Sequence, residues 1–420
     1  MIAAPSRLAP PGAELLLAEP TWAEPPWPEP TWPEPTRLEP TRLARTRAEP
    51  ILAEPNRAKA TLAEPPRVRL PQAEPTWAEP TRSEFPRAEW VAGAAGPPDE
   101  KYDADIVILA LDRVEETLAA IHSALTQTGV SAHLFVLDQG SPTHTLHRFA
   151  ADLAGRRRAT LLAVPQNLGV AGGRNLISAL GHGRVIVALD NDAEFADTET
   201  VARMVAALDA EPRLAALGCR IVTHATGKDD LSSWGYPSSL LPCAGESFDA
   251  VTFVGAGHAI RRTAWNDAGG YDARLFFCWE EFDFCLRAIA RGWRVRYRGD
   301  IVIRHKVSGE RRVGWSGDRW FYYVRNRLYI ERKLGQTWTT MLPRVVGYLI
   351  RSARHGLVLR TVRAIQAAAR LGPAPDMPRI PIAALSYLER NDRQHRGSLL
   401  TRFRREVLAR IGGAASAAAE

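Results

Sequence analysis

Apolar and polar positions alternate in a regular rhythm between residues 102 and 335. Short apolar runs typical of buried strands are separated by longer stretches that carry apolar residues at helical spacing. The predicted strands are, in chain order, "DIVILAL", "AHLFVLD", "ATLLAVP" and "RVIVALD". The predicted helices cover "RVEETLAAIHSALTQTG", His144–Leu153, a segment from about Gly172, and a segment of about 198–210. This alternation predicts an α/β fold with a mostly parallel, doubly wound sheet.

The N-terminal quarter follows a different pattern. From Glu14 to Glu89, five-residue units such as "AEPTW" and "LEPTR" recur, and most of their glutamates precede a proline. Proline lacks the N–H needed in a helix or sheet and pushes the residue before it toward extended conformations. We therefore expect residues 1–100 to form a disordered or polyproline II-like arm, either a dispensable tail or a docking arm that carries tryptophan. A domain at 101–335 and a helical extension at 336–420 follow.

The basic charge of the chain is concentrated in the extension. Residues 336–420 contain fourteen Arg and no Lys against five acids, whereas the whole chain has a net charge of +7. The remainder is slightly acidic, which argues against nucleic acid as a partner. The sequence shows no secretory signal pattern and no uncharged apolar window of 18 residues. The four cysteines lack metal-ligand spacing, so reduced thiols and a cytoplasmic location are expected.

Acidic residues follow several of the predicted strands. In "RVIVALDNDAEF", Asp190 and Asp192 come directly after five apolar residues, and Asp112 and Asp138 follow two other strands. The carboxyl ends of parallel strands share one edge of a sheet, where ligands bind in such folds. Carboxylates that close repel one another unless a positive partner is present. The sequence therefore predicts a ligand site with a cation at this edge.

A glycine-rich segment narrows the class of ligand. "NLGVAGGRN" (Asn167–Asn175) follows a strand and opens a helix, but its glycines do not match the G-x-G-x-x-G of dinucleotide-binding proteins, and neither does "VGAGH" near Gly255. A nicotinamide or flavin enzyme is disfavoured. The segment still places flexible backbone, Arg174 and a helix N-terminus close together, which suits an anionic ligand as well as an ordinary turn.

Four motifs in succession carry a family resemblance. "VLDQGS", "NLGVAGGRN", "ALDNDAEF" and "FVGAGHAIRRTAWNDAGGYDARLFFCWEEFDFCLRAIARGW" resemble inverting, GT-A-fold glycosyltransferases of family 2, in the rhamnosyltransferase-like branch. The resemblance spans about 103–335. It implies hexosyl or deoxyhexosyl transfer from a nucleoside-diphosphate sugar to a hydroxyl of a glycan or lipid-linked acceptor in cell-surface polysaccharide synthesis. A relative that binds nucleotide-sugar or glycan without turnover is the alternative.

The resemblance also implies a donor and metal site. Asp190-Asn191-Asp192 looks like the D-x-D motif, in which Mg²⁺ or Mn²⁺ bridges the carboxylates and the donor diphosphate. His305, after a later strand, matches a histidine that often binds the metal or the diphosphate, with a structural histidine as the alternative. The residues implied in donor binding are Asp138, Asn167, Arg174, Asn175 and Asp190. The family's Pro-Thr-Tyr-Asn after the first strand is replaced here by Leu109–Asp112. The resemblance therefore implies no contacts with the donor's nucleobase at these residues.

Catalytic and acceptor residues are implied by "WEEFDFCLR". Glu281 stands where the family has the aspartate that accepts the acceptor's proton, and Glu280 beside it could share the role. We expect Asp283 to form an i,i+4 ion pair with Arg287 and to be structural. His258 and Trp279 are candidate acceptor-binding residues, with a core position as the equal alternative for His258.

The basic extension admits two readings. "RVVGYLIRSARHGLVLRTVRAI" and "TRFRREVLARI" interleave arginine with aliphatic residues at helical spacing, which suits the interface of an anionic bilayer. A solvated helical appendage on the catalytic domain is the other reading. The first would add peripheral attachment at the inner face of the plasma membrane to a cytoplasmic location.

Overall fold

The computed structural model describes residues 87–306, 317–371 and 380–397. The repeats of the predicted N-terminal arm lie almost wholly outside these residues, and so does "TRFRREVLARI". Strand β1 (Glu89–Gly93) falls inside the range predicted for the arm and pairs antiparallel with β4 (Ala159–Val164). The described sheet therefore begins before residue 100.

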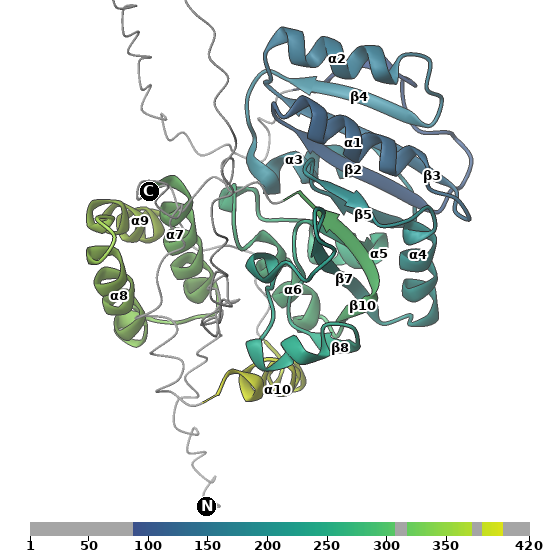
Figure 1. Cartoon of the computed structure of the whole chain (residues 1–420). Coiled ribbons are helices and arrows are strands. Elements are labelled where there is room, and N and C mark those ends of the chain that lie inside the picture. The colour runs from purple at the N-terminus through teal and green to yellow at the C-terminus, as the bar shows by residue number, and fades with distance from the viewer. Residues whose placement is uncertain (1–86, 307–316, 372–379, 398–420) are drawn as a thin grey trace, which may run out of the picture. The chain divides into compact units, whose positions relative to one another are not determined.

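A ten-stranded mixed sheet organises the described residues (Figure 1). Its further strands are β2 (Ala104–Ala110), β3 (Ala132–Gln139), β5 (Val185–Leu189), β6 (Ala193–Phe195), β7 (Leu214–Thr223), β8 (Ser247–Ala250), β9 (Gly257–Arg261) and β10 (Arg294–His305). The strand order is β1-β4-β3-β2-β5-β9-β7-β10-β6, with β8 beside β10. Strands β4, β3, β2 and β5 are parallel, β9 runs against both neighbours, and β7 and β10 are parallel to each other. The predicted α/β class with a mostly parallel central sheet is confirmed.

The four predicted helices form close to their expected positions. The helices of the structure are α1 (Val114–Leu125), α2 (Thr143–Leu153), α3 (Gly169–Ser178), α4 (Thr200–Ala210), α5 (Arg262–Ala268), α6 (Glu280–Ala290), α7 (Gly317–Lys333), α8 (Trp338–Ala353), α9 (Val358–Arg370) and α10 (Ile382–Asn391). Helices α1 and α2 lie side by side against the half of the sheet that contains β2, β3 and β4 (Figure 1). Helix α3 packs on β2 and β3, and α5 packs on α6.

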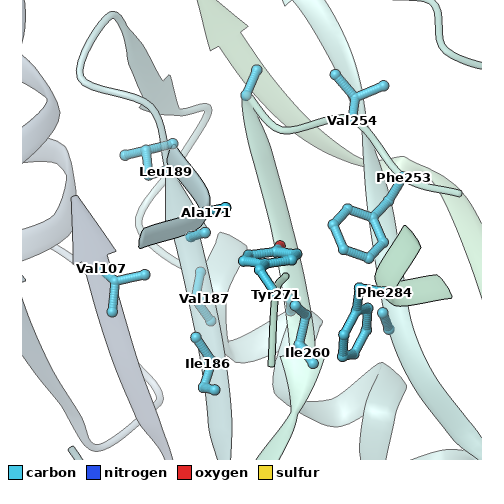
Figure 2. Close-up of a cluster of buried hydrophobic side chains, with 14 of the residues drawn as sticks. Val107, Ala171, Ile186, Val187, Leu189, Phe253, Val254, Ile260, Tyr271 and Phe284 are labelled. Atoms are coloured by element: carbon cyan, nitrogen blue, oxygen red, sulfur yellow. The ribbon is translucent and has the colours of Figure 1, made fainter. Parts of the chain in front are cut away.

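A buried apolar cluster holds α3 and α6 against the middle of the sheet. Figure 2 shows Val107 of β2, Val187 of β5 and Ile260 of β9 together with Ala171 of α3 and Phe284 of α6. Each of these side chains is at most 1% exposed. Complete burial of one large apolar side chain contributes roughly 1.5–3 kcal/mol. This cluster thus fixes the two helices whose polar residues face the strand ends.

The segment before α6 is tied to α7. Asn326 is fully buried, and its side-chain nitrogen Nδ2 donates to the backbone carbonyl oxygens of Leu275, Phe277 and Cys278, each at 2.8 Å. The guanidinium of Arg325 donates to the carbonyl oxygen of Leu275 at 3.0 Å. The Arg-Asn pair therefore has a structural role in holding the entrance to α6. Within the described ranges, none of the helices has the length and apolar content to span a bilayer.

Candidate active site

The predicted D-x-D motif lies at the end of β5. All five residues of this strand are buried, as expected for a central strand covered on both faces. The amide of Asp190 donates to the carbonyl of Ala256 at 3.1 Å, and the amide of Lys306 donates to the carbonyl of Asp192 at 2.8 Å. These backbone bonds tie the motif to the start of β9 and to the residue after β10.

His305, the last residue of β10, lies between two carboxylates. Its Nε2 is 3.4 Å from Asp192 Oδ1, and its Nδ1 is 2.9 Å from Asp230 Oδ2. Burial alone would lower the pKa of His305, but the hydrogen bonds with Asp192 and Asp230 outweigh burial and raise the pKa to about 9. The imidazole in this arrangement is a cation at neutral pH.

Arg113 is a second cation beside Asp192. Its guanidinium is paired with Asp192 Oδ2. Burial would raise the pKa of Asp192, yet the contacts with His305 and Arg113 lower it below the ordinary range. The charge of Asp192 is therefore neutralised by His305 of β10 and by Arg113 of the loop after β2.

Arg174 of α3 connects the D-x-D motif to the predicted base. Its side chain is 4% exposed, and its Nη2 donates to Asp190 Oδ1 at 2.7 Å and to the carbonyl of Gly255 at 2.9 Å. Its Nη1 donates to Glu281 Oε1 at 3.4 Å. A buried guanidinium requires acceptors for its N–H groups. One side chain thus holds a carboxylate from β5 and a carboxylate from α6 on either side of it.

Glu280 and Glu281 open α6. Burial raises the pKa of Glu280 well above its ordinary value, and the neighbouring charge of Glu281 adds to this. Burial also raises the pKa of Glu281, with Arg174 opposing the shift. Within the described residues, Oε2 of Glu280 has no hydrogen-bond partner. A carboxylate whose pKa is raised toward neutrality suits general-base chemistry.

The ion pair predicted for Asp283 is present. Arg287 Nε donates to Asp283 Oδ2 at 2.9 Å, and Lys333 Nζ of α7 lies 2.5 Å from Asp283 Oδ1. All three side chains are buried. Asp283 therefore serves the packing of α6 against α7.

The other predicted donor residues lie in or beside β3 and α3: Asp138 is near the end of β3, Asn167 precedes α3, and Asn175 lies within α3. Asp138 is 1% exposed, and its Oδ2 accepts from the amide of Ser141 at 3.0 Å. Asn167 is exposed, and its Oδ1 accepts from the amide of Gly169 at 2.8 Å. Asn175 holds the backbone of Tyr271, accepting from its amide at 2.9 Å and donating to its carbonyl at 2.7 Å. The contacts of Asp138 and Asn167 are with backbone amides two or three residues further along the chain, whereas Asn175 ties α3 to Tyr271. Donor binding by the three side chains stays a prediction.

The two predicted acceptor residues are buried. His258 has no exposed surface, stacks on Phe253 with ring centroids 4.3 Å apart, and has its Nε2 3.1 Å from the hydroxyl of Tyr271. Burial lowers the pKa of His258 well below its ordinary value. Trp279 is 4% exposed and donates from Nε1 to the carbonyl of Tyr323 at 3.0 Å. Contact of either side chain with an acceptor stays a prediction and would require these packed side chains to move.

Three residues of this site were not predicted from the sequence. Arg113 and Asp230 lie 79 and 75 residues from their partners Asp192 and His305, and no local pattern marks such a distant pairing. Gly255 was noted only as part of a glycine motif. A Cβ atom at this position would lie 2.4 Å from Glu281 Oε1, so the absence of a side chain here makes room for the predicted base.

The two carboxylates of the predicted metal residues fit a hard divalent cation, because Mg²⁺ and Mn²⁺ prefer oxygen ligands. His305 could join them only as the neutral imidazole, after loss of the proton that its raised pKa retains. In the part of the chain that the structure describes, no three His, Cys, Asp or Glu side chains converge as a metal site. Asp192 and His305 are already adjacent, whereas Asp190 turns toward Arg174. A cation held by all three would have to displace protein cations from these carboxylates.

A family model gives the class of the domain. Residues 105–267 match the sequence profile of glycosyl transferase family 2. An uncharacterized protein of Haemophilus influenzae is 24% identical over 168 residues, which are 39% of this chain and 90% of that protein.

Two solved structures are similar at low identity. The mannosyltransferase PcManGT of Pyrobaculum calidifontis, in complex with GDP-Man and Mn²⁺, has a TM-score of 0.44 and 17% identity, covering 75% of this chain and 87% of that one. GalNAc-T7 with UDP, GalNAc and Mn²⁺ has a TM-score of 0.41 and 15% identity, covering 55% and 51%. The profile match covers the strands and helices that carry Asp138, Arg174 and the D-x-D motif. This chain carries a glycosyltransferase domain and is an enzyme of that class.

Proposed function

We propose that the chain is a metal-dependent, inverting glycosyltransferase of the rhamnosyltransferase-like branch. It would move a sugar from a nucleoside diphosphate to a hydroxyl of a glycan or lipid-linked acceptor in cell-surface polysaccharide synthesis. The observation that carries the proposal is the position of Arg174, which contacts both Asp190 and Glu281. The D-x-D motif and the predicted base come from segments about ninety residues apart and are nevertheless joined by one buried cation.

The residues divide into two roles in a single displacement. The acceptor hydroxyl oxygen bonds to the anomeric carbon, the bond from that carbon to the diphosphate breaks, and Glu281 takes the hydroxyl proton. Glu280 can share this proton because the two carboxyls are neighbours and both resist ionisation. Asp190, Asp192 and His305 would hold Mg²⁺ or Mn²⁺, which neutralises charge on the departing diphosphate. Attack from the face opposite the leaving group inverts the anomeric centre.

Two variants test these roles separately. Glu281→Gln should keep the protection against thermal unfolding that a nucleotide-sugar with Mn²⁺ provides, and should lose transfer by a factor of about 10²–10⁴. Asp192→Ala should lose the protection itself. Glu199→Gln, an exposed acid at the start of α4, is the matched control and should do neither. Near-normal transfer by Glu281→Gln would remove Glu281 as the base.

The alternative is a protein that binds nucleotide-sugar or glycan without turnover. Donor hydrolysis in the presence of Mn²⁺, followed for each of a panel of nucleotide-sugars, separates the two. Binding of a donor with neither hydrolysis nor transfer to any acceptor would favour the alternative. The raised pKa values of Glu280 and Glu281 favour the enzyme, because carboxyl groups with perturbed pKa values cluster at catalytic sites.

A further part of the proposal concerns location, which we expect to be cytoplasmic and peripheral at the inner face of the plasma membrane. Helix α8 exposes an apolar stripe whose members are four residues apart and 38–57% exposed: Trp338, Leu342, Val346 and Ile350. The neighbouring α9 exposes Arg363 and Arg370. Apolar side chains beside arginine suit the interface of an anionic bilayer.

Vesicle flotation tests this location. The chain should float with phosphatidylglycerol vesicles and not with phosphatidylcholine vesicles, and the double variant Leu342→Glu, Ile350→Glu should stay in solution. Ile382→Glu, at an exposed apolar residue of α10, is the control. Concentration-dependent self-association that the double variant abolishes, without flotation, would instead assign the stripe to contact between copies of the chain.

A further inference from the structure

The loop between β2 and α1 holds an unusual backbone. Asp112 and Arg113 both have left-handed φ values, 53° and 52°, although neither is glycine. This conformation is unfavourable for residues with a Cβ, so contacts must maintain it. The amide of Asp112 donates to Ser141 Oγ at 2.9 Å, and the carbonyl of Arg113 accepts from the amide of Thr117 at 2.9 Å. These contacts hold the loop in a conformation in which Arg113 reaches Asp192 beyond the end of β5.

Arg113 then reaches a carboxylate that the proposed function assigns to the metal. Its guanidinium pairs with Asp192 Oδ2, while His305 lies beside the other oxygen of the same carboxylate. A divalent cation would have to compete with Arg113 for Asp192. A nucleoside diphosphate, in contrast, brings phosphate oxygens, which a guanidinium binds at least as well as it binds a carboxylate.

The two arginines of the site differ in how freely they can exchange partners. Arg174 is 4% exposed and donates to two carboxylates and one backbone carbonyl, so moving it would leave its own buried charge without acceptors. The side chain of Arg113 is 27% exposed. Arg113 can therefore leave Asp192 at lower cost than Arg174 can leave its acceptors.

We propose that Arg113 is a donor-binding residue that occupies Asp192 while the site is empty and transfers to the donor diphosphate when metal and donor bind. The proposal rests on the function proposed above. In the empty site Arg113 excludes the cation from Asp192. In the filled site the cation takes Asp192, and Arg113 binds a phosphate oxygen. Metal and nucleotide then bind with positive coupling, because each removes the competitor of the other.

The test measures binding, so it does not depend on knowing the sugar or the acceptor. Binding of Mn²⁺ alone is measured from the loss of the free Mn²⁺ electron paramagnetic resonance signal. Binding of UDP, GDP, CDP and dTDP is then measured in turn by calorimetry at saturating Mn²⁺. The variants are Arg113→Gln and Arg113→Lys. The control is Arg148→Gln, which removes a surface arginine of α2 that is paired with Glu115 of α1.

Arg113→Gln should bind Mn²⁺ alone about tenfold more tightly than the parent and should bind the nucleoside diphosphate about tenfold more weakly, within the usual range of coupling between sites. Arg113→Lys should fall between the two because it keeps the charge and loses the paired N–H groups. Unchanged or weaker Mn²⁺ binding by Arg113→Gln, or unchanged nucleotide binding, would overturn the proposal. A parent chain that binds neither Mn²⁺ nor any of the four nucleotides would overturn the proposed function, and the role of Arg113 with it.

Discussion

Replacement of Gly255 by alanine should separate the position of the predicted base from the stability of the fold. A Cβ atom at residue 255 would lie 2.4 Å from Glu281 Oε1, whereas ordinary van der Waals contact begins at 3.4 Å. The carboxylate oxygen must therefore move by about 1 Å. The atom that moves is the end of a flexible side chain, and Gly255 does not have a left-handed φ, so the backbone accepts alanine without strain.

Displacement of the Glu281 carboxylate should lower the turnover rate and leave donor binding almost unchanged. Misplacement of a reacting group by about 1 Å can reduce the rate about 100-fold, which corresponds to about 2.7 kcal/mol in the activation barrier. The same Cβ would lie 3.6 Å from Arg174 Nη1, an ordinary contact, so the donor side is left in place. We expect kcat to fall about 100-fold, and the thermal protection by nucleotide-sugar and Mn²⁺ to persist.

Gly245→Ala is the matched control for this experiment. Its Cβ would meet only Arg220 Nη1, at 3.8 Å, and Gly245 likewise has no left-handed φ. Initial rates and the midpoint of thermal unfolding are measured for both variants. Full activity of Gly255→Ala would refute the argument that Glu281 must occupy its present position. Equal loss of donor protection and turnover would show that residue 255 acts through the donor site instead.

Two further predictions concern buried ionisable groups outside the reacting atoms. Burial, together with the charges of Arg158 and His182, lowers the pKa of His133 to about 4. The unfolded chain binds a proton at this histidine near pH 6.5, whereas the folded chain does not. The free energy of unfolding therefore falls as the pH drops from 6.5 toward 4. Glutamine at residue 133 can keep the hydrogen bond to Thr160. Between pH 7.5 and 5, the unfolding free energy measured in urea should fall by about 2 kcal/mol less in His133→Gln than in the parent. The same pH dependence in both proteins would contradict the role given to His133. Asp283→Asn should lower the unfolding free energy by about 3–5 kcal/mol because it leaves Arg287 and Lys333 without their shared carboxylate, while donor protection below the new midpoint persists. Loss of donor protection without loss of stability would instead place Asp283 in the site.

Local sequence patterns were sufficient to predict several strands and helices of the domain, and to predict which acidic residues lie at the carboxyl edge of the sheet. The apolar run 185–189 predicts a buried strand, and the rule that ligands gather beyond parallel strand ends places Asp190 and Asp192 at the edge. Both predictions needed only the period of the pattern and the chain direction. The acidic segment at the start of α6, where Glu280 and Glu281 lie, was located instead by the family resemblance and by the expected i,i+4 pair of Asp283 with Arg287.

Pairings between distant segments could not be predicted in this way. His258 lies on a short strand whose neighbours on both sides run antiparallel to it, and nothing in "GHAIR" tells whether the imidazole points to the core or to a ligand. Arg113 and Asp230 join the site only because three separate loops meet beyond the sheet edge. Such meetings depend on strand order and register, which a single sequence does not specify.

The electrostatics of the site follow from the different burial of its two arginines. Acidic residues at the end of β5 require positive partners, and the protein supplies them itself: Arg174 for Asp190, and Arg113 with protonated His305 for Asp192. The guanidinium of Arg174 is itself buried and costly to move away from its acceptors, so Arg174 forms a fixed frame that holds Asp190 and positions Glu281. The partly exposed pair is cheap to separate, so Asp192 is the carboxylate that can change partners. If a metal binds as proposed, it must leave Asp192 or stay there when the diphosphate is released, and the return of Arg113 to Asp192 would lower the cost of leaving that carboxylate without the metal.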